Sequence, residues 1–177
     1  DGWSSKLNSR HIAVCGQSVQ VAAPDGSTPT LGPPYLAVIM ACMQAGTAVA
    51  TPLTRKRPAL LDVVGEWNGV LDASEAIQKG IASLSYDNLG WRVERSVTSY
   101  MTDDNPIYSE VSANESINTS VRTLRNRLNI QIGNPVVAGT AAKIKGSVES
   151  SLQKQVADGV IKAWRNVILE DLGDTFN

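Results

Sequence analysis

The sequence has 177 residues, of which 42% are hydrophobic and 19% are charged, so the chain is long enough and apolar enough to bury a core. Its 16 lysines and arginines nearly balance 17 aspartates and glutamates, which gives a net charge of −1. This balance argues against a protein that coats nucleic acid or lies on a membrane surface, because both need a sustained basic excess. No apolar run reaches the roughly eighteen residues of a membrane-spanning helix.

Turn residues separate the predicted elements in the first part of the chain. Residues 11–22 carry β-branched side chains and predict a first strand, and the proline- and glycine-rich residues 24–34 predict a loop. Pro33 and Pro34 suit the first turn of a helix that ends at Gly46. This helix is apolar on nearly every face, so we expect other parts of the protein to cover most of it.

The middle of the chain predicts short elements and a hairpin. Residues 60–64 predict a short strand, and Asp72 is a suitable N-cap for a short helix that runs to Gly80. Two further strands, 81–86 and 91–100, flank an Asp-Asn-Leu-Gly turn. Such a turn between two β-rich stretches is typical of a hairpin.

Two amphipathic helices follow a turn-rich stretch at residues 101–106. The first has an apolar stripe at helical spacing, made of Val111, Ile117, Val121, Leu124 and Leu128. The second has a similar stripe, made of Ala141, Ile144, Val148, Leu152 and Val156. Gly159 ends the second helix, residues 160–169 predict a last strand, and residues 174–177 the beginning of another.

This order of elements predicts the fold class. Strands alternate with helices in the first half, and helices dominate the second. We expect an α/β (α+β mixed) fold, in which a mixed β-sheet is flanked by helices and two long amphipathic helices occupy the C-terminal half.

Few residues are available for catalysis. His11 is the single histidine and lies four residues before Cys15, so a Cys–His pair on one face of a strand is conceivable. We favour a solvent-facing histidine and a core cysteine instead. Cys15 and Cys42 are too few for a disulfide framework and lack the spacing of metal ligands, so both are expected as small core residues in a reducing compartment.

No other constellation predicts a metal or a cofactor. Asp103-Asp104-Asn105 lacks the glycine and the terminal glutamate of a calcium loop, and is typical of a turn that caps a helix. Glycine-rich phosphate loops are absent from the sequence. We therefore expect no catalytic residue, no metal and no cofactor.

Two basic clusters are candidates for binding surfaces. Residues 51–58, which contain Arg-Lys-Arg between prolines, predict a solvated loop or edge strand, with contact to nucleic acid as the alternative. The second cluster consists of Arg122, Arg125, Lys143 and Lys145. It would give the two C-terminal helices a basic outer face, which is either simply solvated or docks to an acidic partner.

An ordered series of motifs resembles a known protein family. The motifs are Glu75-Ala76-Ile77 with Gly80-Ile81, then Gly90-Trp91-Arg92-Val93, Ser96-Val97-Thr98-Ser99-Tyr100, Tyr108-Ser109-Glu110-Val111-Ser112 and Asp158-Gly159-Val160-Ile161. Their order resembles the C-terminal part of the contractile tail sheath proteins of bacteriophages. The resemblance covers residues 73–177 and, more loosely, residues 36–52.

The resemblance implies a structural subunit and no enzyme. Sheath subunits polymerise around an inner tail tube and contract to drive it through the host envelope. The implied partners are copies of the chain itself, the tube protein, and baseplate and tail terminator proteins, without nucleic acid, membrane insertion or a cofactor. The implied location is the virion, after assembly in the cytoplasm of the host bacterium.

The resemblance also implies an organisation of the chain. Residues 1–100 would form an α/β core region, and residues 101–177 a C-terminal region with two helices and a strand. A final arm would be missing, as in a trimmed piece of a longer subunit. Arg122, Arg125, Lys143 and Lys145 would face the tube or a neighbouring subunit.

Two alternatives stay open at this point. One is a sheath subunit of a type VI secretion system or a contractile bacteriocin, which is mechanically alike. The other belongs to a different class and is a hydrolase-like enzyme that uses Cys15 as nucleophile and His11 as base.

Overall fold

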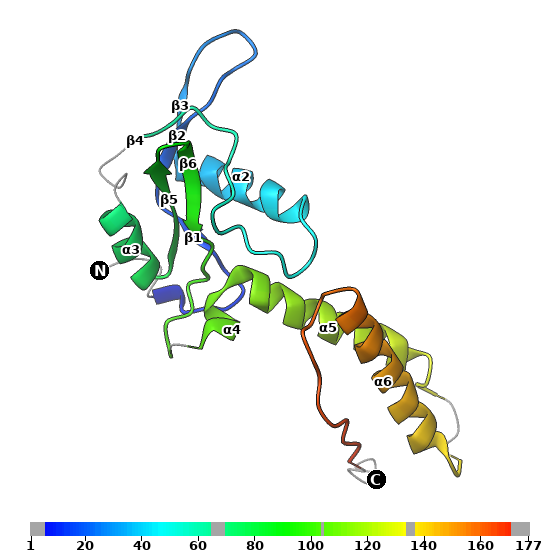
Figure 1. Ribbon diagram of the computed structural model, residues 1–177. Helices are drawn as coiled ribbons and strands as arrows, with labels where there is room; N and C mark the ends of the chain where they lie inside the picture. The colour runs from blue at the N-terminus through cyan, green and yellow to red at the C-terminus, as the bar shows by residue number, and fades with distance from the viewer. Residues whose placement is uncertain (1–5, 65–69, 104, 134–136, 171–177) are drawn as a thin grey trace. The chain divides into compact units, whose positions relative to one another are not determined.

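The computed structural model describes residues 6–64, 70–103, 105–133 and 137–170 (Figure 1). The chain divides into two compact units. Unit 1 is Asp1–Glu115 and unit 2 is Ser116–Asn177.

The first sheet of unit 1 has the strand order β1-β5-β6. β1 (Val14–Cys15) pairs in parallel with β5 (Ile81–Asp87), which pairs antiparallel with β6 (Gly90–Arg95). The hairpin predicted from the Asp-Asn-Leu-Gly turn is therefore confirmed. Its second strand ends five residues earlier than predicted, at Arg95, and Val97 then makes an isolated antiparallel bridge to Glu110.

The second sheet of unit 1 is antiparallel. β2 (Ser18–Gln20) lies between β3 (Thr30–Leu31) and β4 (Asp62–Val64). β4 confirms the short strand predicted at residues 60–64.

The single strand predicted over residues 11–22 is wrong, because the chain changes sheets in the middle of this stretch. β1 belongs to the first sheet and β2 to the second. Between them the Gln17 side chain donates from Nε2 to the Leu84 carbonyl oxygen at 3.0 Å, and its Oε1 accepts from the Leu84 N–H at 2.7 Å. A side-chain amide thus pairs with β5 where a strand residue would otherwise do so.

Helices cover both faces of β5 (Figure 1). α2 (Pro33–Ala45) lies on one side and contributes Leu36 and Met40 to the core. α3 (Val70–Gln78) lies on the other side, where the Ser83 hydroxyl donates to the Ala73 carbonyl oxygen at 3.1 Å. Residues 81–85 are all buried as a result. The core consists of Val19, Leu36, Met40, Leu53, Val63, Ala82, Leu84, Trp91, Val93 and Val97.

Two expectations about these helices need correction. α3 begins at Val70, so Asp72 lies inside its first turn and is not the N-cap. α2 begins with Pro33 and Pro34 and ends before Gly46, as predicted, but it is covered on fewer sides than its composition suggests. Tyr35 and Val38 remain 54% and 59% exposed.

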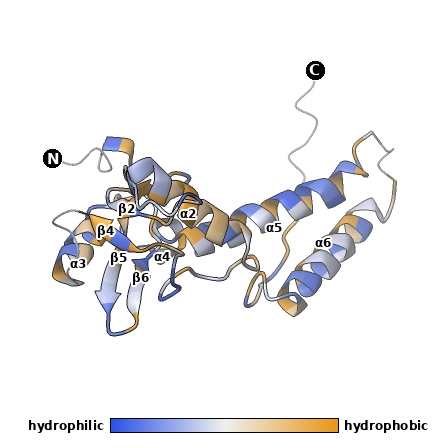
Figure 2. Cartoon of the chain, turned by 90° about the horizontal axis from the view of Figure 1, so that it is seen from above, coloured by the Kyte–Doolittle hydropathy of each residue, from blue (hydrophilic) through white to orange (hydrophobic). Residues whose placement is uncertain are grey.

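Two long helices follow, as predicted: α5 (Val111–Asn129), which the short α4 (Pro106–Ser109) precedes, and α6 (Thr140–Ala157). In unit 2, the Ser120 hydroxyl donates to Gln155 Oε1 at 2.5 Å, and Arg127 Nε donates to the Ser147 hydroxyl at 3.2 Å. The earlier residue of α5 thus pairs with the later residue of α6, and the later residue of α5 with the earlier residue of α6. α6 therefore lies antiparallel to the unit 2 part of α5. Figure 2 shows hydrophilic and hydrophobic colours alternating along both helices.

The buried face of these helices differs in part from the predicted stripes. Val148 is buried, but Val121 and Val156 are 40% and 36% exposed, while Ser151 and Gln155 are buried. The helices therefore meet partly through polar side chains.

The strand predicted over residues 160–169 is wrong. This stretch has no regular secondary structure, and it pairs with none of the strands that the structure describes. The predicted start of a further strand at residues 174–177 lies outside the described residues. Among the helices that the structure describes, none is long and apolar enough to cross a bilayer.

Candidate interaction surfaces

The structure does not bring His11 and Cys15 together as a catalytic pair. The Cys15 thiol donates to the Met40 sulfur at 3.6 Å, and burial raises its pKa to about 11. His11 is exposed, and its Nε2 accepts from Arg10 Nε at 3.2 Å. A nucleophilic cysteine needs a lowered pKa and a nearby base, and Cys15 has neither arrangement.

The second cysteine corrects a further expectation. Cys42 is exposed on α2 and is not a core residue, whereas Cys15 is half-buried. Both thiols are free.

The acidic cluster after β6 works as turn chemistry in the part that the structure describes. Asp103 Oδ1 accepts from the Asn105 N–H at 3.0 Å, and Asn105 Oδ1 accepts from the Ile107 N–H at 3.1 Å, in the first turn of α4. Asp104 lies outside the described residues. Across the described ranges, no group of three or more His, Cys, Asp or Glu side chains is arranged to hold a metal ion.

The Arg-Lys-Arg stretch forms a loop that is tied to the hairpin. The Arg55 N–H donates to the Val93 carbonyl oxygen at 2.7 Å, and the Val93 N–H donates to the Lys56 carbonyl oxygen at 2.8 Å. The Arg57 guanidinium donates to both carboxylate oxygens of Asp87, at 2.7 and 2.8 Å. These contacts give the stretch a structural role at the edge of β6.

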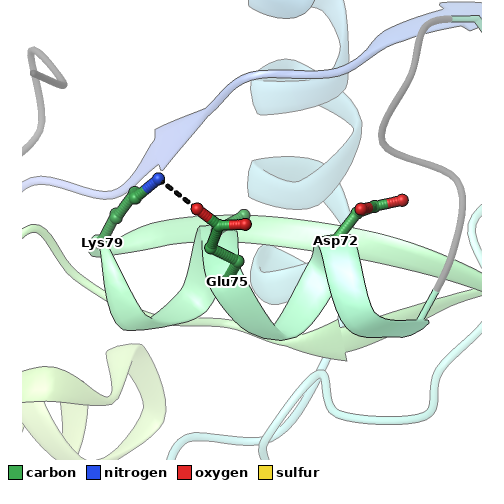
Figure 3. A pocket seen from close by; sticks show the side chains of 4 residues that line it. Asp72, Glu75 and Lys79 are labelled. Carbon is green, nitrogen blue, oxygen red and sulfur yellow. Dashed lines mark hydrogen bonds and ion pairs between the residues drawn. The ribbon is translucent and has the colours of Figure 1, made fainter.

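A small pocket of about 90 Å³ lies along α3 (Figure 3). Figure 3 shows the Lys79 ammonium pointing toward Glu75, while Asp72 lies one turn away from this pair. The Lys79 Nζ and Glu75 Oε1 atoms are 2.6 Å apart. The hydrogen bond from Lys79 lowers the pKa of the Glu75 carboxyl. The pocket is far smaller than typical ligand sites, so we assign it no binding role.

The predicted basic face lies in unit 2. Arg122, Arg125, Lys143 and Lys145 are all exposed, and Lys145 is 3.9 Å from Glu149 in an exposed ion pair. Unit 2 as a whole has eight lysines and arginines against five aspartates and glutamates, whereas unit 1 has eight against twelve. The charge of the chain is therefore segregated. The role of these four residues as contacts stays a prediction.

A larger groove runs beside α2 in unit 1, and sequence reasoning missed it. It has a volume of about 470 Å³ and is lined mainly by apolar residues of β1, α2 and the start of α5. We call it the α2 groove. Ala37, Ala41 and Ala45 follow one another along α2 at four-residue intervals, so small side chains form one wall. The signal in the sequence was the lack of charge on this helix.

Two polar side chains lie at the α2 groove. Gln44 Nε2 donates to Glu115 Oε2 at 2.7 Å, and both residues line the groove. Gln44 Oε1 is buried and has no hydrogen-bond partner among the described residues. The groove thus combines an apolar wall with the carboxylate of Glu115.

Known proteins resemble this chain in structure but not in sequence. No protein-family model matches this sequence, and no curated protein matches it significantly. The chain is similar in structure to the sheath tail proteins of Listeria innocua (TM-score 0.69, 16% identity) and Desulfitobacterium hafniense (TM-score 0.70, 14% identity). Each match extends over 86% of this chain, and over 37% of the Listeria innocua chain and 36% of the Desulfitobacterium hafniense chain.

Two further similar chains come from structures of the anti-feeding prophage. The anti-feeding prophage helical sheath in its contracted state matches with a TM-score of 0.64 at 16% identity, over 85% of this chain and 42% of that one. A chain of the anti-feeding prophage baseplate structure matches with a TM-score of 0.66 at 18% identity, over 86% and 41%. The chain thus spans about two fifths of the length of each solved relative, and over that length it has the fold of a contractile tail sheath protein.

Proposed function

We propose that this chain is part of a structural subunit of a contractile tail sheath, which polymerises around an inner tube and contracts to drive the tube through an envelope. The observation that carries the proposal is the shared fold over 86% of the chain with sheath tail proteins from two bacteria. The resemblance of the ordered motifs in residues 73–177 supports it independently, because it depends on the sequence and not on the fold.

In this proposal the subunit does mechanical work and catalyses no reaction. Contraction would be a shift between two packings of nearly rigid subunits, with the free energy stored in contacts between copies. The Cys15 thiol contacts Met40 and the His11 imidazole contacts Arg10, so the two residues do not form a catalytic pair. This favours the mechanical function over the hydrolase alternative.

We infer a bacteriophage tail as the setting, with assembly in the bacterial cytoplasm. Partners would be copies of the subunit, the tube protein, and the baseplate and tail terminator proteins. The structural similarity to the anti-feeding prophage chains is about as high as the similarity to the two sheath tail proteins. The proposed mechanical function is therefore the same whether the setting is a phage tail or another contractile apparatus.

We propose that the basic face of α5 and α6 contacts the tube. Its support is the exposure of Arg122, Arg125, Lys143 and Lys145 and the excess of positive charge in unit 2. Contacts between exposed charges steer association and weaken as salt rises.

Cosedimentation of the full-length protein with its tube tests this proposal. We expect the full-length protein to pellet with the tube at low salt, and the Lys143→Glu, Lys145→Glu variant to lose most of this binding. A control with Lys6→Glu and Arg55→Glu makes the same charge change in unit 1 and should still pellet. Equal binding by both variants would contradict the tube contact, and no binding by the unmodified protein would contradict the sheath function.

A further inference from the structure

The α2 groove has the size and the lining of a binding site and is open in unit 1. Its volume of about 470 Å³ lies within the range of sites that bury a ligand. Met40, Leu53 and Val111 supply apolar surface, and the small side chains of the three alanines of α2 leave space in the groove. An apolar side chain could therefore enter the groove and leave water.

The polar groups of the groove restrict what could fill it. Gln44 donates from Nε2 to Glu115 at 2.7 Å, and its Oε1 is buried, so an occupant of the groove does not reach that oxygen. Within the described part of the chain, no lysine, arginine or histidine forms an ion pair with Glu115. A matching occupant brings apolar side chains for the wall and a positive charge for Glu115.

Residues 160–169 of unit 2 have this chemistry. The stretch lacks regular structure, and residues 162–170 make no hydrogen bond to any described residue, so their backbone donors are available. Val160, Ile161, Trp164 and Val167 are interspersed with the exposed cations Lys162 and Arg165. Ile168 is 76% exposed, although it is strongly apolar.

We propose that the α2 groove of one copy receives residues 160–169 of a second copy, with Trp164 in the apolar part and Lys162 or Arg165 beside Glu115. The opposite charge balance of the two units, eight basic against twelve acidic residues and eight against five, favours this pairing. The inference rests on the proposed self-association and names one contact of it. Because groove and segment are different surfaces, the contact is head-to-tail and links many copies into chains.

Two variants of the chain separate the two sides of this contact. Ala41→Trp places a large side chain in the groove, and Lys162→Glu with Arg165→Glu reverses the charge of the segment. Val38→Trp is the matched control, because Val38 is 59% exposed on α2 and does not line the groove. Circular dichroism of each variant is the check that its helices are retained.

Sedimentation velocity then gives the result. We expect the unmodified chain and Val38→Trp to associate progressively with concentration, and less so at high salt. Each of the other variants should associate at least about tenfold more weakly. Ala41→Trp fills the groove, and Lys162→Glu with Arg165→Glu brings negative charge toward Glu115. An equal mixture of the two should form one-to-one dimers and nothing larger, since only one intact groove and one intact segment can meet.

Several results would overturn the inference. Ala41→Trp associating like Val38→Trp would place the contact elsewhere, and a mixture without dimers would indicate binding within one chain. An unmodified chain that stays monomeric at every concentration would leave the groove to another protein. Full-length protein that still polymerises when its groove is blocked would refute this contact but leave the sheath function standing.

Discussion

At the scale of single residues, Gln17 shows how a side chain can do the work of a strand. Its amide makes two hydrogen bonds to the backbone of Leu84, at 2.7 and 3.0 Å, where β1 has already ended. Gln17 is 3% exposed, so this pairing satisfies polar groups that would be costly to bury alone. It also lets the chain leave one sheet and enter the next without exposing β5.

The two cysteines should differ strongly in reactivity. Burial raises the pKa of Cys15 to about 11, whereas Cys42 is exposed. Because the thiolate is the reactive form, we expect a disulfide reagent at pH 7 to label Cys42 fast and Cys15 roughly a hundredfold more slowly or worse. The Cys42→Ser variant should lose the fast phase, and labelling of Cys15 should accelerate as pH rises toward 11. Fast labelling of Cys15 at neutral pH would instead revive the nucleophile hypothesis.

Asp87 should make stability depend on pH at the acid end. Hydrogen bonds from Arg57, and then from the Leu89 N–H, lower the pKa of this carboxyl in the folded chain. A lowered folded pKa adds stability that is present above the unfolded pKa and is lost as pH falls through the folded pKa. We therefore expect Asp87→Asn to lower the urea midpoint at pH 7 and to approach the unmodified chain in strong acid. Glu170→Gln, which removes an exposed charge, should change little at either pH, and an equal loss there would contradict the role of the pair.

At the scale of elements, local patterns were sufficient for helices and for the hairpin. Pro33 and Gly46 delimit α2, and the Asp-Asn-Leu-Gly turn joins β5 to β6, because each signal acts within a few residues. The strand at 160–169 could not be decided this way, since a strand exists only beside a partner. The break at Gln17 likewise depends on Leu84, which is 67 residues away.

The candidate surfaces were predictable only in part. Exposure of Arg122 and Lys143 follows from their place off the apolar stripe of each helix. The lack of charge on α2 is a local signal for the α2 groove, but the Gln44–Glu115 hydrogen bond beside it joins residues 71 apart and follows from no local pattern. The part-buried Ser120–Gln155 contact is also non-local, since it joins residues 35 apart.

The junction of α3 and β5 should not tolerate a side chain at Gly80. Gly80 has a φ of +72°, and a Cβ there would lie 3.1 Å from the Ser99 Cα and 3.2 Å from the Thr98 carbonyl oxygen. Gly26 has a φ of +82° and nothing within 4 Å, so it is a control for backbone strain alone. We expect Gly26→Ala to lower the free energy of unfolding by about 1 kcal/mol, and Gly80→Ala by about 1–3 kcal/mol more. Urea unfolding followed by tryptophan fluorescence measures both, and equal losses would contradict the crowding.

At the scale of the whole molecule, the features of interest lie at the surface of each unit. These features are the four exposed cations of α5 and α6, the α2 groove, and the exposed side chains within residues 160–169, which have no regular secondary structure. The polar groups that the sequence singled out in unit 1 are paired within the unit: Cys15 contacts Met40 in a part-buried position, and Arg57 forms an ion pair with Asp87 at the surface. This distribution suits a subunit whose work is done at its contacts with other subunits.

Electron microscopy of the full-length protein, alone and with its tube, tests this view most directly. We predict long tubular polymers of repeating subunits, in which the fold of unit 1 fits the repeating density unchanged. Single particles that never polymerise, at any concentration and with or without the tube, would contradict it.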